Sequence, residues 1–336
     1  MDKIRFGIVG YGHVGNKHRQ HILAHPDAEL IAVCDMDYNK TKSIKNTGLH
    51  VFELLEDMLT MCQLDVLCVC TPNYLHCVHT LAGLENNCHV VVEKPMAIMV
   101  SDCEKMIEKA TKKKKSIFTV MQNRYAPSAK WLKKLIEQDA LGKIFQIQVN
   151  CIWNRNQEYY SQGNWRGKQA MDGGVLFTQF SHFIDILYYL HGDIRDYIGG
   201  ITANFNHPYT EIEDSGSFVM YSQKNAIVNF NYSICSHGQN MESSLTIIAE
   251  KGTIRIGGQY LDKIEYNSIE NTSVPMLETT AANDYGFYQG SMNNHDKIIA
   301  NVIDNLMYGK LFVSSAEDGK AVVNIIENMY KTAKRL

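Results

Sequence analysis

The chain has 336 residues, of which 45% are hydrophobic and 21% charged, and its formal net charge is -3 at pH 7. This length exceeds what one hydrophobic core usually supports, so we expect two domains, or one domain with a large extension. The composition excludes a fibrous or largely disordered protein. The small negative charge gives no chain-wide attraction for nucleic acid or anionic lipid. Partners must therefore be inferred from local motifs.

The nine cysteines are odd in number, lie mostly in apolar runs and never form a C-x-x-C pair. This pattern favours buried, reduced thiols over disulfides or a zinc site. The first residues include no long apolar run, and no stretch of about eighteen uninterrupted apolar residues occurs anywhere. We therefore expect a soluble, cytoplasmic protein with no signal peptide, no membrane span and no bound metal.

In the first third of the chain, short β-branched runs alternate with helical patterns, which predicts a parallel sheet wrapped by helices. The expected strands cover residues 4–9, 30–34, 66–70, 89–92 and 117–121. Ser101 followed by Glu104 is a capping-box pattern, which predicts the start of a helix there.

After Pro127 a helix is predicted with a buried stripe that includes Leu132 and Leu135, and the period then changes to two. From Phe145 to Trp153 apolar and polar residues alternate, as is typical of a half-buried antiparallel strand. Similar runs at 228–234, 245–249 and 254–256 predict a mostly antiparallel sheet. Two helices close the chain, the second after a capping box from Ser314 to Glu317.

The first expected strand is followed by a G-x-G-x-x-G sequence, which here lies between a strand and a helix. Gly10 permits the tight turn, Gly12 leaves room for a pyrophosphate, and Gly15 allows the helix to pack closely on the strand. The N–H groups at the start of this helix then face the phosphates. We therefore predict a dinucleotide site that includes Gly10, Gly12, His13, Val14 and Gly15.

Asp35 ends the next expected strand, twenty residues after Gly15, where a carboxylate would accept hydrogen bonds from the adenosine ribose. Met36 and Asp37 follow, so no Arg or Lys lies immediately beyond it to meet a 2′-phosphate. The sequence therefore predicts NAD rather than NADP. The alternative is a tight strand-to-helix turn without a ligand, and the combination of strand, spacing, helix and acid argues against it.

Two further segments end expected strands of the first domain, where ligands of open parallel sheets bind. They are Thr71-Pro72-Asn73-Tyr74-Leu75-His76 and Glu93-Lys94-Pro95, and a helix with the pattern G-G-x-L-x-x-x-x-x-H-x-x-D follows from Gly173 to Asp185. Together with the glycine loop, these segments closely resemble the Gfo/Idh/MocA family, the relatives of glucose-fructose oxidoreductase and inositol dehydrogenase. The resemblance spans essentially the whole chain.

The resemblance implies an α/β fold of two domains. Residues 1–123 would form an NAD-binding Rossmann domain with a parallel sheet. Residues 124–336 would form an α+β domain with a large, mostly antiparallel open sheet for substrate binding and oligomerisation, whose C-terminal helices are able to pack back on the first domain. It also implies cofactor contacts from Thr71, Pro72, Asn73, His76, Glu93 and Lys94, and assembly into a homodimer or homotetramer.

Oxidation of a sugar alcohol needs a group that accepts the hydroxyl proton while the nicotinamide takes the hydride. The resemblance assigns catalytic roles to Lys94 and His182, since a desolvated lysine can have its pKa lowered towards neutrality and histidine titrates there already. Which of the two accepts the proton stays open. Members like inositol dehydrogenase have an aspartate four residues before this histidine, whereas this chain has Thr178, so the electrostatics of the site differ.

Further segments include Gln122-Asn123-Arg124, Trp153-Asn154-Arg155, Trp165-Arg166-Gly167 and Gln179-Phe180-Ser181-His182. They resemble one branch of the family, the bacterial UDP-N-acetylglucosaminuronate 3-dehydrogenases of surface-polysaccharide biosynthesis. A UDP-sugar acid carries a diphosphate and a carboxylate, so its pocket needs arginines and aromatic faces. The substrate-binding candidates are Arg124, Arg155, Tyr159, Tyr160, Trp165, Arg166, Gln179 and His182. Plain core or subunit interface is the alternative for the aromatic residues. The expected helix start at Gly173-Gly174 is a further place for an anion.

The working hypothesis is NAD-dependent oxidation of the C3 hydroxyl of UDP-N-acetylglucosaminuronate, or a related UDP-sugar, to a 3-keto sugar, with a 2-oxo acid as a candidate oxidant of NADH. One alternative is a dehydrogenase of a free sugar or polyol, against which Thr178 argues. Another is a non-catalytic NAD(P)-binding regulator, against which the presence of Lys94 and His182 argues. Four other histidines lack acidic partners at metal spacing and are interpreted as solvated or packed: His18, His21, His25 and His79.

Overall fold

The structure is a computed structural model that describes residues 2–44, 47–270, 272–274, 277, 282–284 and 289–336. The chain divides into two compact units. The first unit consists of Met1–Val120 and His295–Val323, and the second of Met121–Asn294 and Asn324–Leu336. A segment near the end of the chain therefore returns to the unit in which the chain begins.

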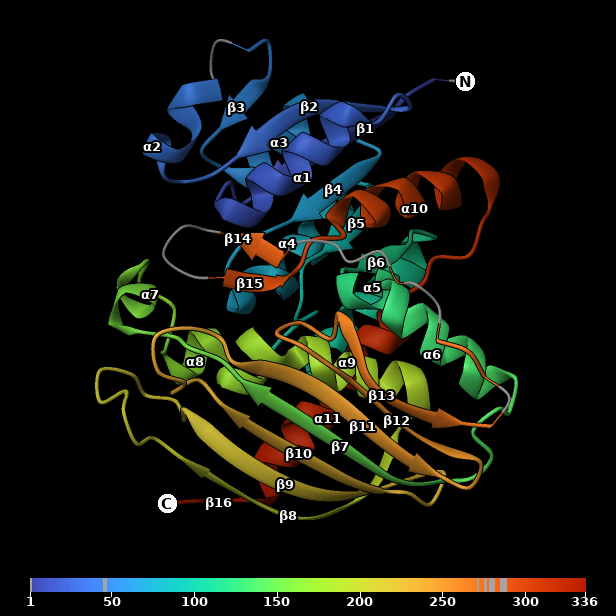
Figure 1. The fold of residues 1–336 in the computed structure, drawn as a ribbon. Coiled ribbons are helices and arrows are strands. Elements are labelled where there is room, and N and C mark those ends of the chain that lie inside the picture. Colours follow the sequence, from blue (N-terminus) through green and yellow to red (C-terminus); the bar gives the residue numbers. More distant parts are fainter. Residues whose placement is uncertain (1, 45–46, 271, 275–276, 278–281, 285–288) are drawn as a thin grey trace. The chain divides into compact units, whose positions relative to one another are not determined.

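The first unit is built on a parallel sheet, as predicted (Figure 1). Over the described residues it has six strands in the order β3-β2-β1-β4-β5-β6. Their bounds are β1 (Ile4–Val9), β2 (Ala28–Cys34), β3 (His50–Phe52), β4 (Val66–Val69), β5 (His89–Val92) and β6 (Ile117–Thr119). The strand order reverses between β1 and β4, and open α/β sheets bind ligands beyond the carboxyl ends of strands at such a point.

Helices of the first unit connect these strands and cover the sheet. They are α1 (His13–Ala24), α2 (Tyr38–Thr41), α3 (Leu55–Met61), α4 (His76–Glu85), α5 (Val100–Lys113), α10 (His295–Tyr308) and the first part of α11 (Ala316–Thr332). The central strands of the sheet carry apolar side chains on both faces and are buried. All four residues of β4, for example, are completely buried. α10 packs against α1, the helix that follows the glycine loop.

Neither predicted capping box forms at the residues for which it was predicted. α5 begins at Val100 after Met99, so Ser101 lies inside the first turn and the prediction of a cap there is wrong. At α11 the motif exists one residue later than predicted: the Ser315 N–H and hydroxyl donate to the Asp318 carboxylate, and the Asp318 N–H donates back to the Ser315 hydroxyl. The hydroxyl of Ser314 donates instead to the carbonyl of Thr119.

The second unit contains a large, mostly antiparallel sheet, as predicted. Its described strands run in the order β13-β12-β11-β7-β10-β9-β8-β16, and among them the pairs β7–β10 and β8–β16 are parallel. The bounds are β7 (Ile144–Ile152), β8 (Ile194–Ala203), β9 (Ser215–Ser222), β10 (Ile227–Ser233), β11 (Glu242–Ala249), β12 (Gly252–Gly257), β13 (Lys263–Ile269) and β16 (Ala333–Arg335). A separate pair consists of β14 (Ala282–Asp284) and β15 (Gln289–Met292).

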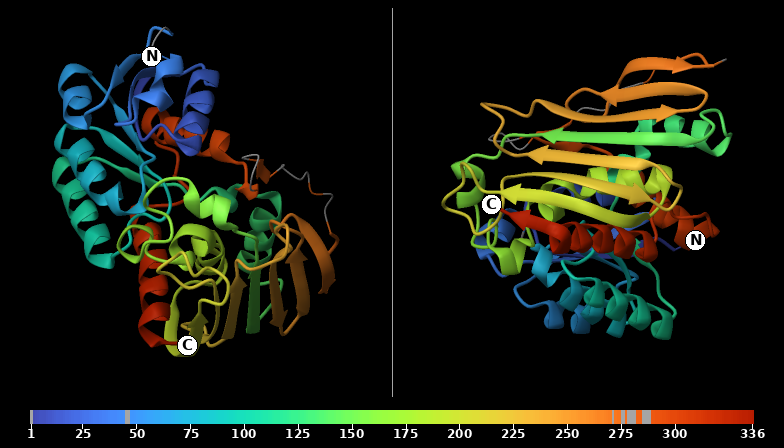
Figure 2. Two further views of the ribbon diagram at one scale, coloured as in Figure 1. Left: turned by 90° about the vertical axis from the view of Figure 1, so that its left-hand side faces the viewer. Right: turned by 90° about the horizontal axis from the view of Figure 1, so that it is seen from below.

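Helices of the second unit lie against one face of this sheet, which Figure 2 shows from two directions. They are α6 (Pro127–Glu137), α7 (Gln157–Ser161), α8 (Gln169–Asp172), a π-helical segment (Leu176–Phe180) and α9 (Ser181–His191). The inward row of β7 includes the predicted Ile147, Val149 and Cys151, but Phe145 is 46% exposed. The register with β11 skips Phe145, so a bulge turns its side chain to the other face.

None of the described helices is both long and apolar enough to cross a membrane.

Candidate active site

The glycine loop has the geometry that each of its glycines was predicted to allow. A Cβ on Gly10, whose φ is +88°, would lie 2.6 Å from the carbonyl carbon and oxygen of Cys70, and one on Gly15 would lie 2.1 Å from the Gly10 carbonyl oxygen. Gly12 precedes α1, and a Cβ there would meet nothing within 4 Å. Two glycines are therefore needed for close packing, and the third leaves open space before the helix.

This open space faces the start of α1, which begins with the predicted residues His13 and Val14. The first turn carries no acidic side chain, so the partial positive charge of the helix start is not offset locally. Backbone N–H groups at such a helix start bind phosphate groups. The loop and helix thus fit the pyrophosphate of a dinucleotide.

Asp35 follows β2 and is 7% exposed. Its carboxylate accepts hydrogen bonds from the N–H groups of Tyr11 (2.7 Å) and Asp37 (2.9 Å), which fix its position next to the glycine loop. Lys40 on α2 approaches the same carboxylate, with 3.4 Å between its Nζ and Oδ1 of Asp35. Sequence reasoning considered only the residues immediately after Asp35. It therefore missed Lys40, which α2 places beside the Asp35 carboxylate.

The Thr71–His76 segment follows β4, and its histidine points into the protein rather than towards solvent. His76 is 1% exposed, and its Nδ1 and Nε2 lie 2.7 Å and 2.8 Å from the carbonyl oxygens of Pro95 and Thr71. Burial lowers the pKa of His76, whereas two carbonyl acceptors favour the doubly protonated ring. The side chain links two loops through backbone groups, so its role is to position them, and Asn73 is likewise buried.

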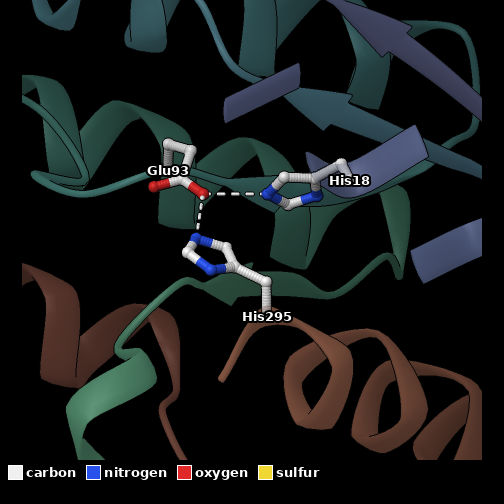
Figure 3. Close-up of side chains that lie close together, drawn as sticks. All are labelled: His18, Glu93 and His295. Carbon is white, nitrogen blue, oxygen red and sulfur yellow. Dashed lines mark hydrogen bonds and ion pairs between the residues drawn. The ribbon is translucent and has the colours of Figure 1, made fainter. Parts of the chain in front are cut away.

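Glu93 follows β5 and is held by two histidines, as Figure 3 shows. Its Oε1 lies 2.8 Å from Nε2 of His18 on α1 and 3.5 Å from Nε2 of His295 at the start of α10. Its Oε2 accepts the N–H of Lys94 at 3.3 Å. Burial alone would raise the pKa of Glu93, but the hydrogen bonds from the two histidines hold it well below its usual value.

Sequence reasoning did not find this cluster. His18 was interpreted as solvated or packed without an acidic partner, and that partner is Glu93, 75 residues away. His295 received no interpretation at all. No local spacing could have joined these residues, because they come from three separate elements.

In the second unit, His182 is the second residue of α9 and is 4% exposed. Its Nε2 lies 3.4 Å from the amide nitrogen of Gln122, and the same amide donates to the Ser291 hydroxyl at 3.3 Å. The Ser291 hydroxyl in turn donates to the side-chain oxygen of Asn123 at 3.0 Å. His182 therefore lies in a buried polar group on an otherwise apolar helix.

Thr178 lies in the π-helical segment that leads into α9. Its hydroxyl donates to the carboxylate of Asp172, which is 1% exposed and also accepts the Gly167 N–H at 2.7 Å. A neighbouring residue thus supplies a buried carboxylate beside Thr178, although position 178 itself carries none.

Arg124 and Asp185 form a buried ion pair. Their side chains are 2% and 1% exposed, and both Nε and Nη2 of Arg124 bind the carboxylate, with 2.6 Å between Nη2 and Oδ1. The guanidinium also lies 4.8 Å from the ring centre of Tyr189. These contacts favour a structural role for Arg124, which the sequence had placed among the substrate-binding candidates, and they give Asp185 the partner that sequence reasoning could not assign.

The structure brings five other predicted substrate residues together around Tyr159. Nε of Arg155 donates to Gln179 at 2.7 Å, and the Gln179 amide donates to the Tyr159 hydroxyl at 2.6 Å. The guanidinium carbons of Arg155 and Arg166 lie 5.3 Å and 4.4 Å from the Tyr159 ring centre. Trp165 lies within 5.7 Å of the Arg166 guanidinium, and the Tyr160 ring packs edge-on against Tyr159.

A polar pocket of about 250 Å³ adjoins this cluster, and Arg155 is part of its wall. His207 also lines it, and both of its ring nitrogens face acceptors: Asp214 at 3.0 Å and the Arg155 carbonyl oxygen at 2.6 Å. Burial would lower the pKa of His207, but the hydrogen bonds to Asp214, Cys235 and the Arg155 carbonyl together outweigh burial and raise it to about 10. His207 and Asp214 therefore form a buried ion pair beside the pocket, which sequence reasoning did not identify.

The prediction of an anion site at Gly173-Gly174 is wrong. The N–H of Val175, at the helix start, donates to the Glu213 carboxylate at 3.0 Å, and the next N–H, of Leu176, donates to the Tyr330 hydroxyl at 3.0 Å. A Cβ on Gly174 would lie 2.3 Å from that hydroxyl. The protein's own side chains therefore fill the space in which a ligand anion was expected.

Comparison with protein-family models gives two matches. Residues 4–121 match the model described as "Oxidoreductase family, NAD-binding Rossmann fold", and residues 129–255 match the GFO/IDH/MocA C-terminal domain.

Solved and curated proteins of several activities are similar to this chain. The crystal structure of the WlbA dehydrogenase from Bordetella pertussis, in complex with NADH and UDP-GlcNAcA, is 30% identical with a TM-score of 0.88, over 98% of this chain and 96% of that chain. D-glucoside 3-dehydrogenase of Escherichia coli is 30% identical over 56% of this chain, and the match spans about half of that protein, 54%. The 2,7-anhydro-N-acetylneuraminate hydratase of Escherichia coli is 26% identical over 76% of this chain and 71% of that protein.

Proposed function

Because the chain belongs to the Gfo/Idh/MocA family of NAD-binding oxidoreductases, we propose that it is a dehydrogenase that oxidises the C3 hydroxyl of UDP-N-acetylglucosaminuronate or a related UDP-sugar. The likeness to the WlbA dehydrogenase along nearly the whole chain carries this proposal, since that protein was crystallised with NADH and UDP-GlcNAcA. The name of D-glucoside 3-dehydrogenase supports carbon 3 as the site of oxidation.

Bound NAD supplies the hydride acceptor. In this proposal the open space at Gly12 and the N–H groups of His13 and Val14 would hold its pyrophosphate, and the Asp35 carboxylate would accept a hydrogen bond from its adenosine ribose. Lys94 is the proposed acceptor of the hydroxyl proton, with His182 as the alternative.

The nucleotide-sugar part of the proposal rests on the cluster around Tyr159 and the adjoining pocket. Arg155 and Arg166 supply positive charge for a diphosphate or a carboxylate, and Tyr159 and Trp165 supply ring faces. A free, uncharged sugar would need none of these cations.

The direct test combines the protein with NAD, UDP-N-acetylglucosaminuronate and 2-oxoglutarate. A 3-keto sugar and reduced 2-oxoglutarate are expected, detected by mass spectrometry, because tightly held NADH could recycle without a lasting absorbance change. Lys94→Ala is expected to abolish turnover while NAD binding persists. Absence of both the keto product and any absorbance change would overturn the proposal, and full activity of Lys94→Ala would leave His182 as the proton acceptor.

A second candidate is a dehydrogenase of a free sugar, which the likeness to D-glucoside 3-dehydrogenase favours. The carboxylate of Asp172 beside Thr178 also weakens the objection that this region lacks an acid. Arg166→Gln separates the two candidates. It should lower kcat/KM for a UDP-sugar at least tenfold if the arginine binds the nucleotide sugar, and it should leave the oxidation of a free glucoside unchanged.

We also propose that the chain assembles through the open face of the large sheet. Several apolar residues of neighbouring strands are exposed, including Phe145 (46%), Ile198 (68%), Val219 (43%) and Ile227 (46%). Contiguous exposed apolar surface is unusual in monomers and marks interaction sites. Light scattering after size-exclusion chromatography should show a dimer or tetramer, and Val219→Lys with Ile227→Lys should dissociate it. A monomeric wild-type protein would contradict this.

A further inference from the structure

His18, Glu93 and His295 form a cluster of buried titratable side chains in the first unit to which the proposed reaction assigns no step (Figure 3). Their relative exposures are 0%, 6% and 2%. His18 comes from the helix of the glycine loop, His295 from the start of α10, and Glu93 directly precedes the proposed proton acceptor, Lys94. The cluster therefore connects the cofactor loop to the turn that carries the reactive lysine.

The distances in this cluster are those of hydrogen bonds rather than of a metal site. Ligands of a tetrahedral zinc ion at about 2.1 Å lie about 3.4 Å apart, whereas Nε2 of His18 and Oε1 of Glu93 are 2.8 Å apart. Within the described part of the chain, Nδ1 of His18 and Nδ1 of His295 have no hydrogen-bond partner. Metal-bound imidazoles almost always have such a partner on the second nitrogen.

We propose that His18 and His295 are positioning residues: by binding the ionised Glu93 carboxylate between α1 and α10, they prevent it from pairing with the ammonium group of Lys94. This inference rests on the function proposed above for Lys94. Both carboxylate oxygens have partners in this arrangement, since Oε1 faces the two imidazoles and Oε2 accepts the Lys94 N–H.

The physical reason is the competition for a single buried carboxylate. A carboxylate beside an ammonium group raises the pKa of a lysine by about 1 to 3 units, and each unit lowers the fraction of neutral amine about tenfold at a given pH. The imidazoles of His18 on α1 and His295 on α10 instead bind the Glu93 carboxylate, so that it does not pair with the ammonium group. Lys94 can then lose its proton at a lower pH than a lysine paired with its own neighbour.

Other charged and titratable groups interact electrostatically with members of the cluster or with Lys94. His76, whose ring is held between the carbonyls of Thr71 and Pro95, interacts electrostatically with Glu93 and Lys94. His21 interacts electrostatically with His18 and His295 and also with Asp296 and Lys17, and the thiols of Cys68 and Cys70 interact with Glu93. The turn at Lys94 is therefore fixed on one side through Glu93 and on the other through Pro95.

The test measures the protonation of Lys94 without any sugar substrate. Purified full-length protein is labelled with trace acetic anhydride between pH 6 and pH 11, and the rate at Lys94 is followed by peptide mass spectrometry, with the exposed Lys112 as internal reference. The variants are His18→Asn, His18→Gln, His295→Asn and Glu93→Gln. A glutamine amide can reach the position of the imidazole Nε2, whereas an asparagine amide cannot, so the first two variants form a matched pair.

We expect His18→Asn to raise the pH midpoint of Lys94 labelling by about 1 unit or more. His295→Asn should raise it less, because its contact is 3.5 Å rather than 2.8 Å, and His18→Gln should restore the wild-type midpoint. Glu93→Gln removes the carboxylate and should shift the midpoint downwards. A purely structural role would not move the midpoint in opposite directions.

The inference is overturned if the midpoint stays at the wild-type value in both asparagine variants while they still bind NAD, or if Glu93→Gln shifts it upwards. Should His18→Asn not fold, as judged by loss of NAD binding, His295→Asn and Glu93→Gln decide. Failure of the proposed function has a different signature, since absence of turnover with a UDP-sugar leaves the labelling midpoints unaffected. Turnover with unchanged midpoints overturns only the role of the histidines.

Discussion

Replacement of Asp185 by asparagine is expected to destabilise the second unit, because it leaves the guanidinium of Arg124 buried without its counter-charge. The two side chains are 2% and 1% exposed, and Nε and Nη2 of Arg124 both bind the carboxylate. Breaking a buried ion pair by removing one partner costs about 3 to 5 kcal/mol. Asparagine retains one acceptor oxygen, so the lower end, about 3 kcal/mol, is expected.

For a unit of this size, about 3 kcal/mol corresponds to a fall of about 6 to 12 °C in Tm. Differential scanning calorimetry in the absence of NAD measures it. The matched control replaces Glu108, whose ion pair with Lys112 is exposed to solvent, by glutamine, and no measurable change in Tm is expected.

The double variant Arg124→Met, Asp185→Leu removes both charges and should recover most of the lost stability, since apolar replacements of buried ion pairs are often neutral or stabilising. An Asp185→Asn protein with wild-type Tm, or a double variant less stable than the single one, would refute the assignment of this pair as a buried structural contact. It would then return Arg124 to the substrate-binding residues.

Three further predictions concern the cofactor loop and a buried acid. Gly12→Ala should fold normally but bind NAD at least tenfold more weakly, because its methyl group enters the open space proposed for the pyrophosphate. Gly15→Ala should instead destabilise the apo protein. Isothermal titration with NAD and calorimetry of the apo protein distinguish the two effects. Asp35→Ser should weaken NAD binding and favour NADP, and a second change, Lys40→Ala, should abolish that gain if Lys40 meets the 2′-phosphate. Burial raises the pKa of Glu213 from 4.5 to about 7, so its contribution to stability is full below pH 4.5 and is lost as the pH rises through 7. Glu213→Gln should therefore remove about 3 kcal/mol of the pH dependence of unfolding, and an unchanged pH profile of Tm would contradict this.

The sequence predicts those parts of the fold that depend on local patterns. The strands at Ile4–Val9 and His89–Val92 have the predicted bounds, because short runs rich in β-branched residues are a strong local pattern. The roles of the glycines follow from steric rules, and their contacts agree with those rules. β3 (His50–Phe52) was not predicted, since three half-exposed residues are too short to show a period.

The parts that the sequence did not predict depend on contacts between distant elements. Phe145 is turned outwards by a register shift between β7 and β11, and no alternation within β7 shows this. Glu213 occupies the helix start after Gly174, 38 residues away, and so replaces a ligand anion that the glycines alone suggested. Asp172 reaches Thr178 because the chain between them turns at Gly173 and then forms a π-helical segment.

The measurement that tests the central claim most directly follows the hydride itself. UDP-N-acetylglucosaminuronate carrying deuterium at C3 is incubated with the protein and NAD, and the cofactor is then released and analysed by mass spectrometry; the same sugar with deuterium at C4 is the control. Our account predicts deuterium in the reduced nicotinamide from the C3-labelled sugar alone, even if NADH never accumulates in solution. Transfer from C4 would contradict the assigned position, and transfer from neither would contradict the assignment of the chain as a dehydrogenase of this sugar.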